Sequence, residues 1–321
     1  MLAAYATAPN PSDPLAALEV GDRPDPEAPA GWTTVTVRAA SINHHDVWTL
    51  RGVGLAEDKY PMILGCDASG VDGEGRDVVV HAVIPSPDWS GDETLDPRRT
   101  LLSEKHQGTL AQQVIVPTRN VLPKPAELSH EEAACLSTAW LTAYRMLFVK
   151  SGVRPGATVL VQGASGGVAT ALLALGAAAG YRMWVTGRTE AKRQAALELG
   201  ADAAFEPGAR LPKRVDAVME TVGEATWSHS LKSLAPGGTV VVCGATSGPN
   251  PPADLSRVFF LQLSVVGSTM GTRSELESLM AMLVTTGVRP VIDTTMPLDR
   301  AADGFAKIIA GDTAGKIVLT V

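Results

Sequence analysis

The sequence predicts an α/β protein with a β-rich module first and a doubly wound parallel sheet after it. Residues 33–38, 77–83 and 112–117 alternate or run apolar over strand lengths, with turn residues at their ends. From about residue 158, apolar strands alternate with helical segments, which is typical of parallel βαβ units. Their runs of valine and leucine indicate strands that helices cover on both faces.

The elements follow in chain order. Residues 84–108 are polar and contain prolines, so we expect a loop. Ser129 precedes Glu132 by three residues, a capping-box spacing that begins a helix. We expect the last elements to return to the first module. After the helix that begins at Ser129, we expect strand 158–162 with its helix, helix 190–200, strand 215–221 and a helix around 227–234. These are followed by strands 236–244 and 263–269, helix 274–287, and a closing helix and strand in 303–321.

The composition limits the class of protein. Hydrophobic residues make up 45% of the 321 residues, and the net charge of −7 is spread without long blocks. We therefore expect a soluble globular protein without a nucleic-acid surface. The start of the chain does not read as a signal peptide, and no apolar run is long enough for a membrane span. Three widely spaced cysteines suit a reducing compartment, so we expect a cytoplasmic protein.

A glycine-rich turn carries the clearest functional motif. The apolar strand 158–162 runs into "GASGGVA" and then into a helix. Glycines allow a tight turn and a close backbone approach, and the helix N-terminus favours a pyrophosphate. This strand–turn–helix context predicts a dinucleotide cofactor, although an ordinary tight turn is the alternative. The predicted contacts are Gly163, Ala164, Ser165, Gly166, Gly167 and Val168.

The end of the next strand indicates which dinucleotide binds. A site for NAD usually places an acidic residue there, to accept from the ribose 2′-hydroxyl. This chain instead has Gly187, Arg188, Thr189 and Lys192. Cationic and hydroxyl donors suit a 2′-phosphate, so we predict NADPH. The alternative is a solvated helix start that Thr189 caps.

The order of several motifs resembles a known family. "SINHHDVWTLRG", "PMILGCDASGV", "GTLAQQVIVP", "AACLSTAWLTAYRML" and "GKIVL" resemble the medium-chain dehydrogenase/reductase superfamily, and its zinc-independent quinone oxidoreductase-like branch in particular. The resemblance covers nearly the whole chain. It implies a GroES-like catalytic domain from residues 1–120 and 271–321, with a Rossmann NADP(H)-binding domain, 121–270, inserted between them.

The resemblance also bears on metal. Asn43, Cys66 and Thr138 stand where zinc-dependent members have their three ligands, and Asn and Thr are poor zinc ligands. A rearranged site with His44, His45, Cys66 and Asp67 is the alternative. On an extended segment the two histidines would point to opposite faces, which argues against it. We therefore predict no metal, Cys66 as a small buried hydrophobe and Asp67 as an acceptor for loop backbone N–H groups.

The resemblance implies roles for further residues. Asn43, Thr138 and Thr142 are expected near the nicotinamide and the acceptor. Asn43 is expected to donate to the acceptor oxygen or, alternatively, to be a turn residue, and Thr142 is alternatively a packing residue on its helix. Tyr60 is expected to flank the substrate or to shield a loop. The remaining expected cofactor contacts are Thr221, Val222, Cys243, Gly244, Ala245, Ser268 and Lys316.

These expectations define a function. We predict NADPH-dependent hydride transfer, without metal, to a small-molecule acceptor that is a quinone or an α,β-unsaturated carbonyl compound. The alternatives are a zinc-type alcohol dehydrogenase and a non-catalytic NADPH-binding sensor or structural protein. The apolar segment 259–271 contains no proline and no charged residue. We expect it to be an edge strand through which the chain forms a homodimer; the alternative is an edge that the chain's own loops cover.

Overall fold

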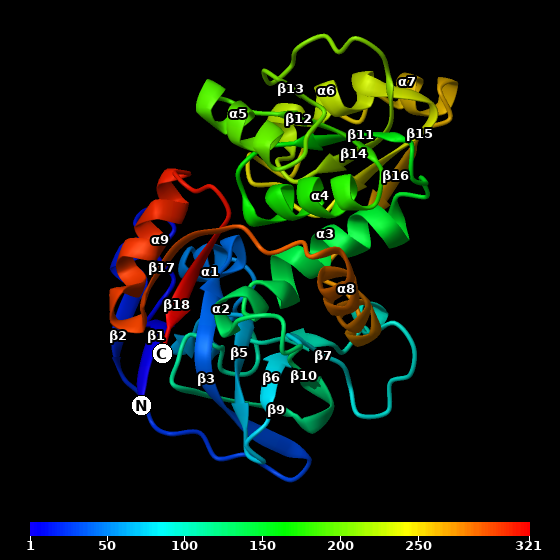
Figure 1. Ribbon diagram of the computed structural model, residues 1–321. Helices are drawn as coiled ribbons and strands as arrows, with labels where there is room; N and C mark the ends of the chain where they lie inside the picture. Colours follow the sequence, from blue (N-terminus) through cyan, green and yellow to red (C-terminus); the bar gives the residue numbers. More distant parts are fainter. The chain divides into compact units, whose positions relative to one another are not determined.

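The computed structural model describes all 321 residues, and the chain forms two compact units (Figure 1). The first unit contains Met1–Leu141 and Met270–Val321, and the second contains Thr142–Thr269. The second boundary agrees with the predicted one within one residue, but the first lies after Leu141 and not after residue 120. Residues beyond 120 stay with the first unit because β10 (Val121–Pro123) pairs with β6 of its central sheet.

A seven-stranded sheet forms the centre of the first unit. Its strand order is β10-β6-β5-β3-β18-β17, and β9 also pairs with β3. The last strand of the chain lies antiparallel beside β3, with Ile317 opposite Ile42, so the chain end returns to this module as predicted. Smaller sheets have the orders β2-β1-β4 and β7-β8. The strands of this unit are β1 (Leu2–Ala6), β2 (Leu18–Asp22), β3 (Trp32–Ile42), β4 (Met62–Ile63), β5 (Asp67–Asp72), β6 (Asp77–Val80), β7 (Val83–Ile84), β8 (Thr100–Leu101), β9 (Gln113–Pro117), β10 (Val121–Pro123), β17 (Ile292–Pro297) and β18 (Lys316–Thr320).

Helices pack against this sheet and close the core of the unit. The Ser129 hydroxyl accepts from the N–H of Glu132, and the Glu132 carboxylate accepts from the N–H of Ser129, which confirms the predicted capping box. Phe305 is fully buried in the main core of the unit. Beyond the capped start at Ser129, the chain takes the wider π-helical form over Leu136–Trp140 and Arg145–Lys150. The helices are α1 (His44–Leu50), α2 (His130–Ala133), α8 (Arg273–Thr286) and α9 (Ala301–Ala310), and the short α3 (Leu141–Tyr144) spans the boundary between the two units.

The second unit is a doubly wound parallel sheet of six strands, as predicted. The strand order is β13-β12-β11-β14-β15-β16, and every neighbouring pair is parallel. Helices α4 and α6 lie on opposite sides of this sheet (Figure 1). The strands are β11 (Thr158–Gln162), β12 (Arg182–Thr186), β13 (Ala203–Phe205), β14 (Val215–Glu220), β15 (Leu234–Val242) and β16 (Ser264–Gly267), and the helices are α4 (Gly167–Ala178), α5 (Glu190–Glu198), α6 (Glu224–Ser233) and α7 (Leu255–Phe260).

The segment 259–271 differs from its prediction. It was expected to be strand-like throughout, but α7 contains Phe259 and Phe260, and only Ser264–Gly267 forms a strand. The two phenylalanines are largely exposed, so the apolar sequence here forms a surface and not the interior of a sheet. The strand β16 does lie at the end of the sheet, as predicted. None of the helices combines the length and the apolarity that crossing a membrane requires.

Candidate active site

A buried polar cluster surrounds Asn43, the residue that immediately precedes α1. The Asn43 amide nitrogen donates to Asp67 Oδ2 at 2.8 Å, and the Ser41 hydroxyl donates to the same oxygen at 2.9 Å. Lys316, on the last strand, donates to Asn43 Oδ1 and to Asp67 Oδ2. The ammonium and the carboxylate are both buried, so each compensates the other's charge.

The prediction for Asp67 is wrong. Its Oδ2 accepts from the side chains of Ser41, Asn43 and Lys316, and not from loop N–H groups, because Asp67 begins the central strand β5 and faces β3 and β18. Its Oδ1 is buried without a partner. Lys316 also donates to Ile42 O at 3.1 Å, so its three N–H groups have partners inside the cluster. The contact of Lys316 with the cofactor stays a prediction, as does donation by Asn43 to an acceptor.

The glycine turn of the second unit has the geometry that its sequence predicts. Gly163 follows β11 with a φ of +87°, a conformation that favours glycine. Gly166 is the N-cap of α4, and no side chain caps this helix. A Cβ atom added at Gly166 would meet nothing within 4 Å. The start of α4 therefore has room for a ligand next to backbone N–H groups that favour an anion.

A chain of polar side chains links the carboxyl ends of three neighbouring strands. The Thr186 hydroxyl donates to Gln162 Oε1 at 2.7 Å, and the Gln162 amide donates to Ser230 Oγ at 3.0 Å. Ser230 donates to Glu220 Oε2 at 2.6 Å, and Glu220 Oε1 accepts from the N–H of Val222 at 2.8 Å. Sequence reasoning missed this chain, although a polar residue that ends each apolar strand was a visible signal.

The residues predicted to select the dinucleotide lie between the end of β12 and the first turn of α5. Arg188 and Thr189 are exposed, and the Thr189 hydroxyl caps α5 by accepting from the N–H of Lys192 at 3.3 Å. Arg193, which sequence reasoning missed, donates to Gly187 O at 2.8 Å and pairs with Glu190 at 2.7 Å. Arg193 therefore fixes the loop that presents Arg188. Both the capping function and the phosphate contact are compatible with this geometry.

The other predicted cofactor residues follow β14, β15 and β16, which are neighbours in the sheet. Thr221 donates to Gln162 O at 3.1 Å, and a Cβ atom at Gly244 would approach Thr221 O to 3.0 Å. Ser268 has a buried hydroxyl without a partner. Removal from water, and then the charge of Glu220, raise the pKa of Cys243 to about 12, so its thiol stays protonated. Val222 and Ala245 lie in the same two loops, at the edge of a parallel sheet where ligands bind.

Comparison with known proteins identifies the family of this chain. Residues 29–126 match the model described as "Alcohol dehydrogenase GroES-like domain", and residues 167–285 match "Zinc-binding dehydrogenase". A solved structure titled as an NAD-dependent alcohol dehydrogenase is 32% identical, with a TM-score of 0.91, and the match covers 100% of both chains. The chain belongs to the medium-chain dehydrogenase/reductase superfamily. The resemblance that the sequence motifs indicated is thereby confirmed at the level of the superfamily.

Reductases of this superfamily are also among the similar proteins. An acryloyl-coenzyme A reductase from Metallosphaera sedula is 27% identical over 94% of this chain and 96% of its own length. The structure of a 2-octenoyl-CoA carboxylase reductase in complex with NADP and 2-octenoyl-CoA is 25% identical, with a TM-score of 0.91. That match covers 99% of this chain and 87% of the other.

The residues at the superfamily's zinc positions do not fit a zinc ion. Asn43 offers an amide whose oxygen already accepts from Lys316. Thr138 offers a hydroxyl on the π-helical segment Leu136–Trp140, and this hydroxyl is buried without a partner. Cys66 is the one strong ligand of the three. A single thiol cannot form the three-ligand site that catalytic zinc requires.

Cys66 lies instead in a cluster with a histidine. Its Sγ is 3.6 Å from His45 Nδ1 and 3.7 Å from Ser103 Oγ, and it donates to Leu102 O at 3.2 Å. On the other side of the imidazole, His45 Nε2 is 3.1 Å from Glu104 Oε1. The prediction of an extended segment at His44 and His45 is wrong, because both lie in the first turn of α1. Burial of Cys66 is confirmed, but its polar contacts exceed those of a simple hydrophobe.

His45, Asp46 and Cys66 form a group whose candidate ligand atoms lie within 4.8 Å of one another. Its geometry is poor for a metal ion. Both Asp46 oxygens already accept backbone N–H groups, from Asn43 and Gly65, at 2.8 Å each. The 4.0 Å between His45 Nδ1 and Asp46 Oδ1 exceeds the roughly 3.3 Å between nitrogen and oxygen ligands on a tetrahedral zinc. Asp46 is therefore part of the local fold of α1, and the group does not fit a metal.

Two further predicted residues have structural contacts. The Tyr60 hydroxyl donates to Thr49 O of α1 at 2.8 Å. Thr142 is buried and belongs to the second unit. Contact of Tyr60 with substrate, and of Thr138 and Thr142 with the reacting groups, stay predictions.

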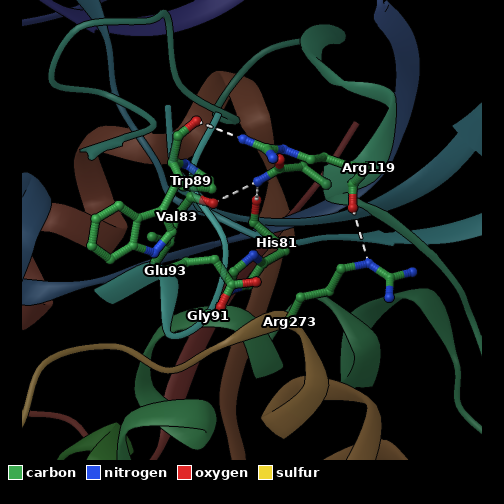
Figure 2. Close-up of a pocket in the computed structure, with 9 residues that line it drawn as sticks. His81, Val83, Trp89, Gly91, Glu93, Arg119 and Arg273 are labelled. Carbon is green, nitrogen blue, oxygen red and sulfur yellow. Dashed lines mark hydrogen bonds between the residues drawn. The ribbon is translucent and has the colours of Figure 1, made fainter. Parts of the chain in front are cut away.

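A separate cavity of about 180 Å³ lies in the first unit (Figure 2). Arg119 and Arg273 line it, but both guanidinium groups are engaged. Arg119 donates to Pro85 O at 2.7 Å, and Arg273 donates to Arg119 O at 3.0 Å. The bond from Arg119 fixes the loop after β7. None of the predicted site residues lines this cavity.

Proposed function

We propose that the protein is an NADPH-dependent reductase that delivers hydride to an α,β-unsaturated carbonyl compound or a quinone without a metal ion. The observation that carries the proposal is the residue set Asn43, Cys66 and Thr138, which replaces the zinc ligands of the superfamily. Without a Lewis acid, an electron-poor acceptor is the substrate that needs the least activation. Relatives whose names describe reduction of enoyl thioesters support this chemistry.

The cofactor supplies the hydride, and the chain's own residues bind and orient it. The open start of α4 at Gly166 is suited to the pyrophosphate. Arg188 and Lys192 are suited to a 2′-phosphate, and one relative was solved with NADP. The polar chain from Thr186 to Glu220 fixes the strand ends around the binding loops.

A second function has a specific observation in its favour. The relative that is 32% identical is titled as an NAD-dependent alcohol dehydrogenase. Alcohol oxidation requires removal of the hydroxyl proton, which zinc normally assists. This chain lacks that ligand set, so we place alcohol oxidation second. An NADPH-binding protein without turnover is the remaining alternative.

The test is a panel assay with the purified chain. NADPH and NADH oxidation would be followed by nicotinamide absorbance with enones, enoyl thioesters and quinones, and the reverse reaction with primary and secondary alcohols. We expect turnover with the electron-poor acceptors, a preference for NADPH, and no loss after chelator treatment. Turnover with alcohols alone would refute the proposal, and tight NADPH binding without any turnover would favour a sensor.

A further inference from the structure

We propose that Arg193 is a specificity-determining residue for NADPH, an inference that rests on the cofactor of the proposed function. Arg193 fixes the backbone at Gly187, and the next residue, Arg188, is thereby held in position for the 2′-phosphate. NADH carries a hydroxyl group in place of this phosphate, so it gains little from a fixed Arg188. Arg193 is therefore a positioning residue that acts on the choice between the two cofactors and not on hydride transfer.

Gly187 is buried and is held from three sides. Its N–H donates to Phe205 O of β13 at 2.9 Å, and its carbonyl oxygen accepts from Arg193 Nη1 at 2.8 Å. A Cβ atom added at Gly187 would lie 3.1 Å from Ala164 Cβ of the glycine turn and 3.0 Å from Arg193 Cγ. Gly187 is thus closely packed as well as hydrogen-bonded. Removal of the Arg193 side chain would open one of the three sides and leave the carbonyl without its donor.

The guanidinium of Arg193 is itself held in place by two carboxylates. Its Nε and Nη2 donate to Glu190 Oε2 at 3.2 and 2.7 Å, and Nη2 also lies 3.5 Å from Glu206 Oε1. The side chain of Arg193 is 14% exposed, whereas those of the two glutamates are 79% and 76% exposed. All three nitrogens of the guanidinium are therefore engaged, and Arg193 is suited to fixing the loop and not to binding a phosphate.

Arg188 differs from Arg193 in having an available guanidinium. It is exposed and forms no hydrogen bond or ion pair within the chain. Its backbone, however, lies between two fixed residues, because Gly187 precedes it and Thr189, the N-cap of α5, follows it. A loop that is already ordered loses less conformational entropy when it binds a ligand. Arg193 therefore strengthens the binding of a 2′-phosphate by Arg188 without a contact of its own.

The experiment measures the dissociation constants of NADPH and NADH by nicotinamide fluorescence, so it requires no knowledge of the acceptor. Arg193→Ala should raise the NADPH constant roughly ten-fold, as expected for the loss of a charged hydrogen bond that orders the loop. The NADH constant should stay within about two-fold of the wild type. Arg214→Ala is the matched control, because Arg214 also donates to a backbone carbonyl of the second unit, Leu234 O at the start of β15, at 3.1 Å. It should leave both constants unchanged.

A double variant tests whether Arg193 acts through Arg188. Adding Arg193→Ala to Arg188→Ala should change the NADPH dissociation constant by less than about two-fold, because the residue that Arg193 positions is already gone. Arg193→Lys keeps the charge and one donor, so it should weaken NADPH binding less than Arg193→Ala does, and it takes that variant's place if Arg193→Ala does not fold.

The outcomes separate the inference from the proposed function. Additive effects in the double variant, equal weakening of NADPH and NADH, or an Arg193→Ala variant that keeps the wild-type preference would overturn the inference alone. A wild type that binds NADH as tightly as NADPH would overturn the cofactor preference of the proposed function and the inference with it.

Discussion

Buried His81 should make the first unit sensitive to acid. Its side chain is 1% exposed and its Nε2 lies 3.0 Å from Gly271 O, a residue 190 positions further along the chain. Burial is the main cause that lowers the pKa of His81 from 6.5 to about 4. The hydrogen bond to Gly271 raises the pKa and so offsets part of this effect. Arg273 lowers this pKa further and Glu275 raises it. The folded chain thus prefers the neutral ring, whereas the unfolded chain protonates it near pH 6.5.

The sign and size of the effect follow from this difference. Stability is complete above pH 6.5 and falls as the pH drops towards 4, because only the unfolded state gains the proton. Each pH unit in this window costs about 1.4 kcal/mol, so the loss from His81 is about 2 kcal/mol at pH 5 and about 3 kcal/mol at pH 4.

Urea unfolding followed by circular dichroism would measure this effect at neutral and acid pH. With a urea dependence of about 1–3 kcal/mol per molar, the midpoint should fall by about 1 M between pH 7 and pH 5. His81→Gln keeps an N–H donor for Gly271 but cannot titrate, so most of that fall should disappear. His106→Gln, at a half-buried histidine of the same unit, is the matched control. Equal pH dependence in the wild type and His81→Gln would refute the reasoning.

Three further predictions concern metal, cofactor and assembly. Elemental analysis of the purified protein should find no stoichiometric zinc, and one tightly bound zinc per chain would contradict the ligand argument. Arg188→Ala should raise the Michaelis constant for NADPH roughly ten- to a hundred-fold, as expected for the loss of a charged hydrogen bond. The Michaelis constant for NADH should rise far less. Equal effects on the two cofactors would count against a 2′-phosphate contact. We expect a homodimer through the edge of β16, where Val265 is 51% exposed; Phe259 and Phe260 of the preceding helix α7 are also exposed. Light scattering should show a dimer that Val265→Lys weakens, and a monomeric wild type would rule it out.

Local patterns made much of the fold predictable. The strand–glycine–helix unit at residues 158–178 and the capping box at Ser129 depend on residues a few positions apart, and the structure has both. The helix at His44 had a comparable signal, since Asn43 and Asp46 have the N-cap and N3 spacing. Local propensity also failed at Phe259, where an apolar run that suits a strand forms the end of a short helix.

The candidate active site was less predictable because its contacts join distant parts of the chain. Asn43 was identified from the motif around it, but its partner Lys316 lies 273 residues away, and no periodicity relates the two. Glu104 contacts His45 from a loop whose sequence has no regular pattern. Sequence motifs could identify the candidate groups, but which of these groups contact one another depends on the three-dimensional arrangement of the strands.

The place of the last strand also bears on biosynthesis. The six strands of the second unit are contiguous in the sequence, so this unit can complete its sheet while later residues are still being translated. The first unit cannot, because β18 inserts between β3 and β17. Until residue 316 leaves the ribosome, Asp67 lacks its ammonium partner and the part of β3 from Ala39 to Ile42 has one unpaired edge. A chain stalled shortly before its end would therefore carry a finished insert inside an unfinished module, with an unpaired strand edge that chaperones would have to protect.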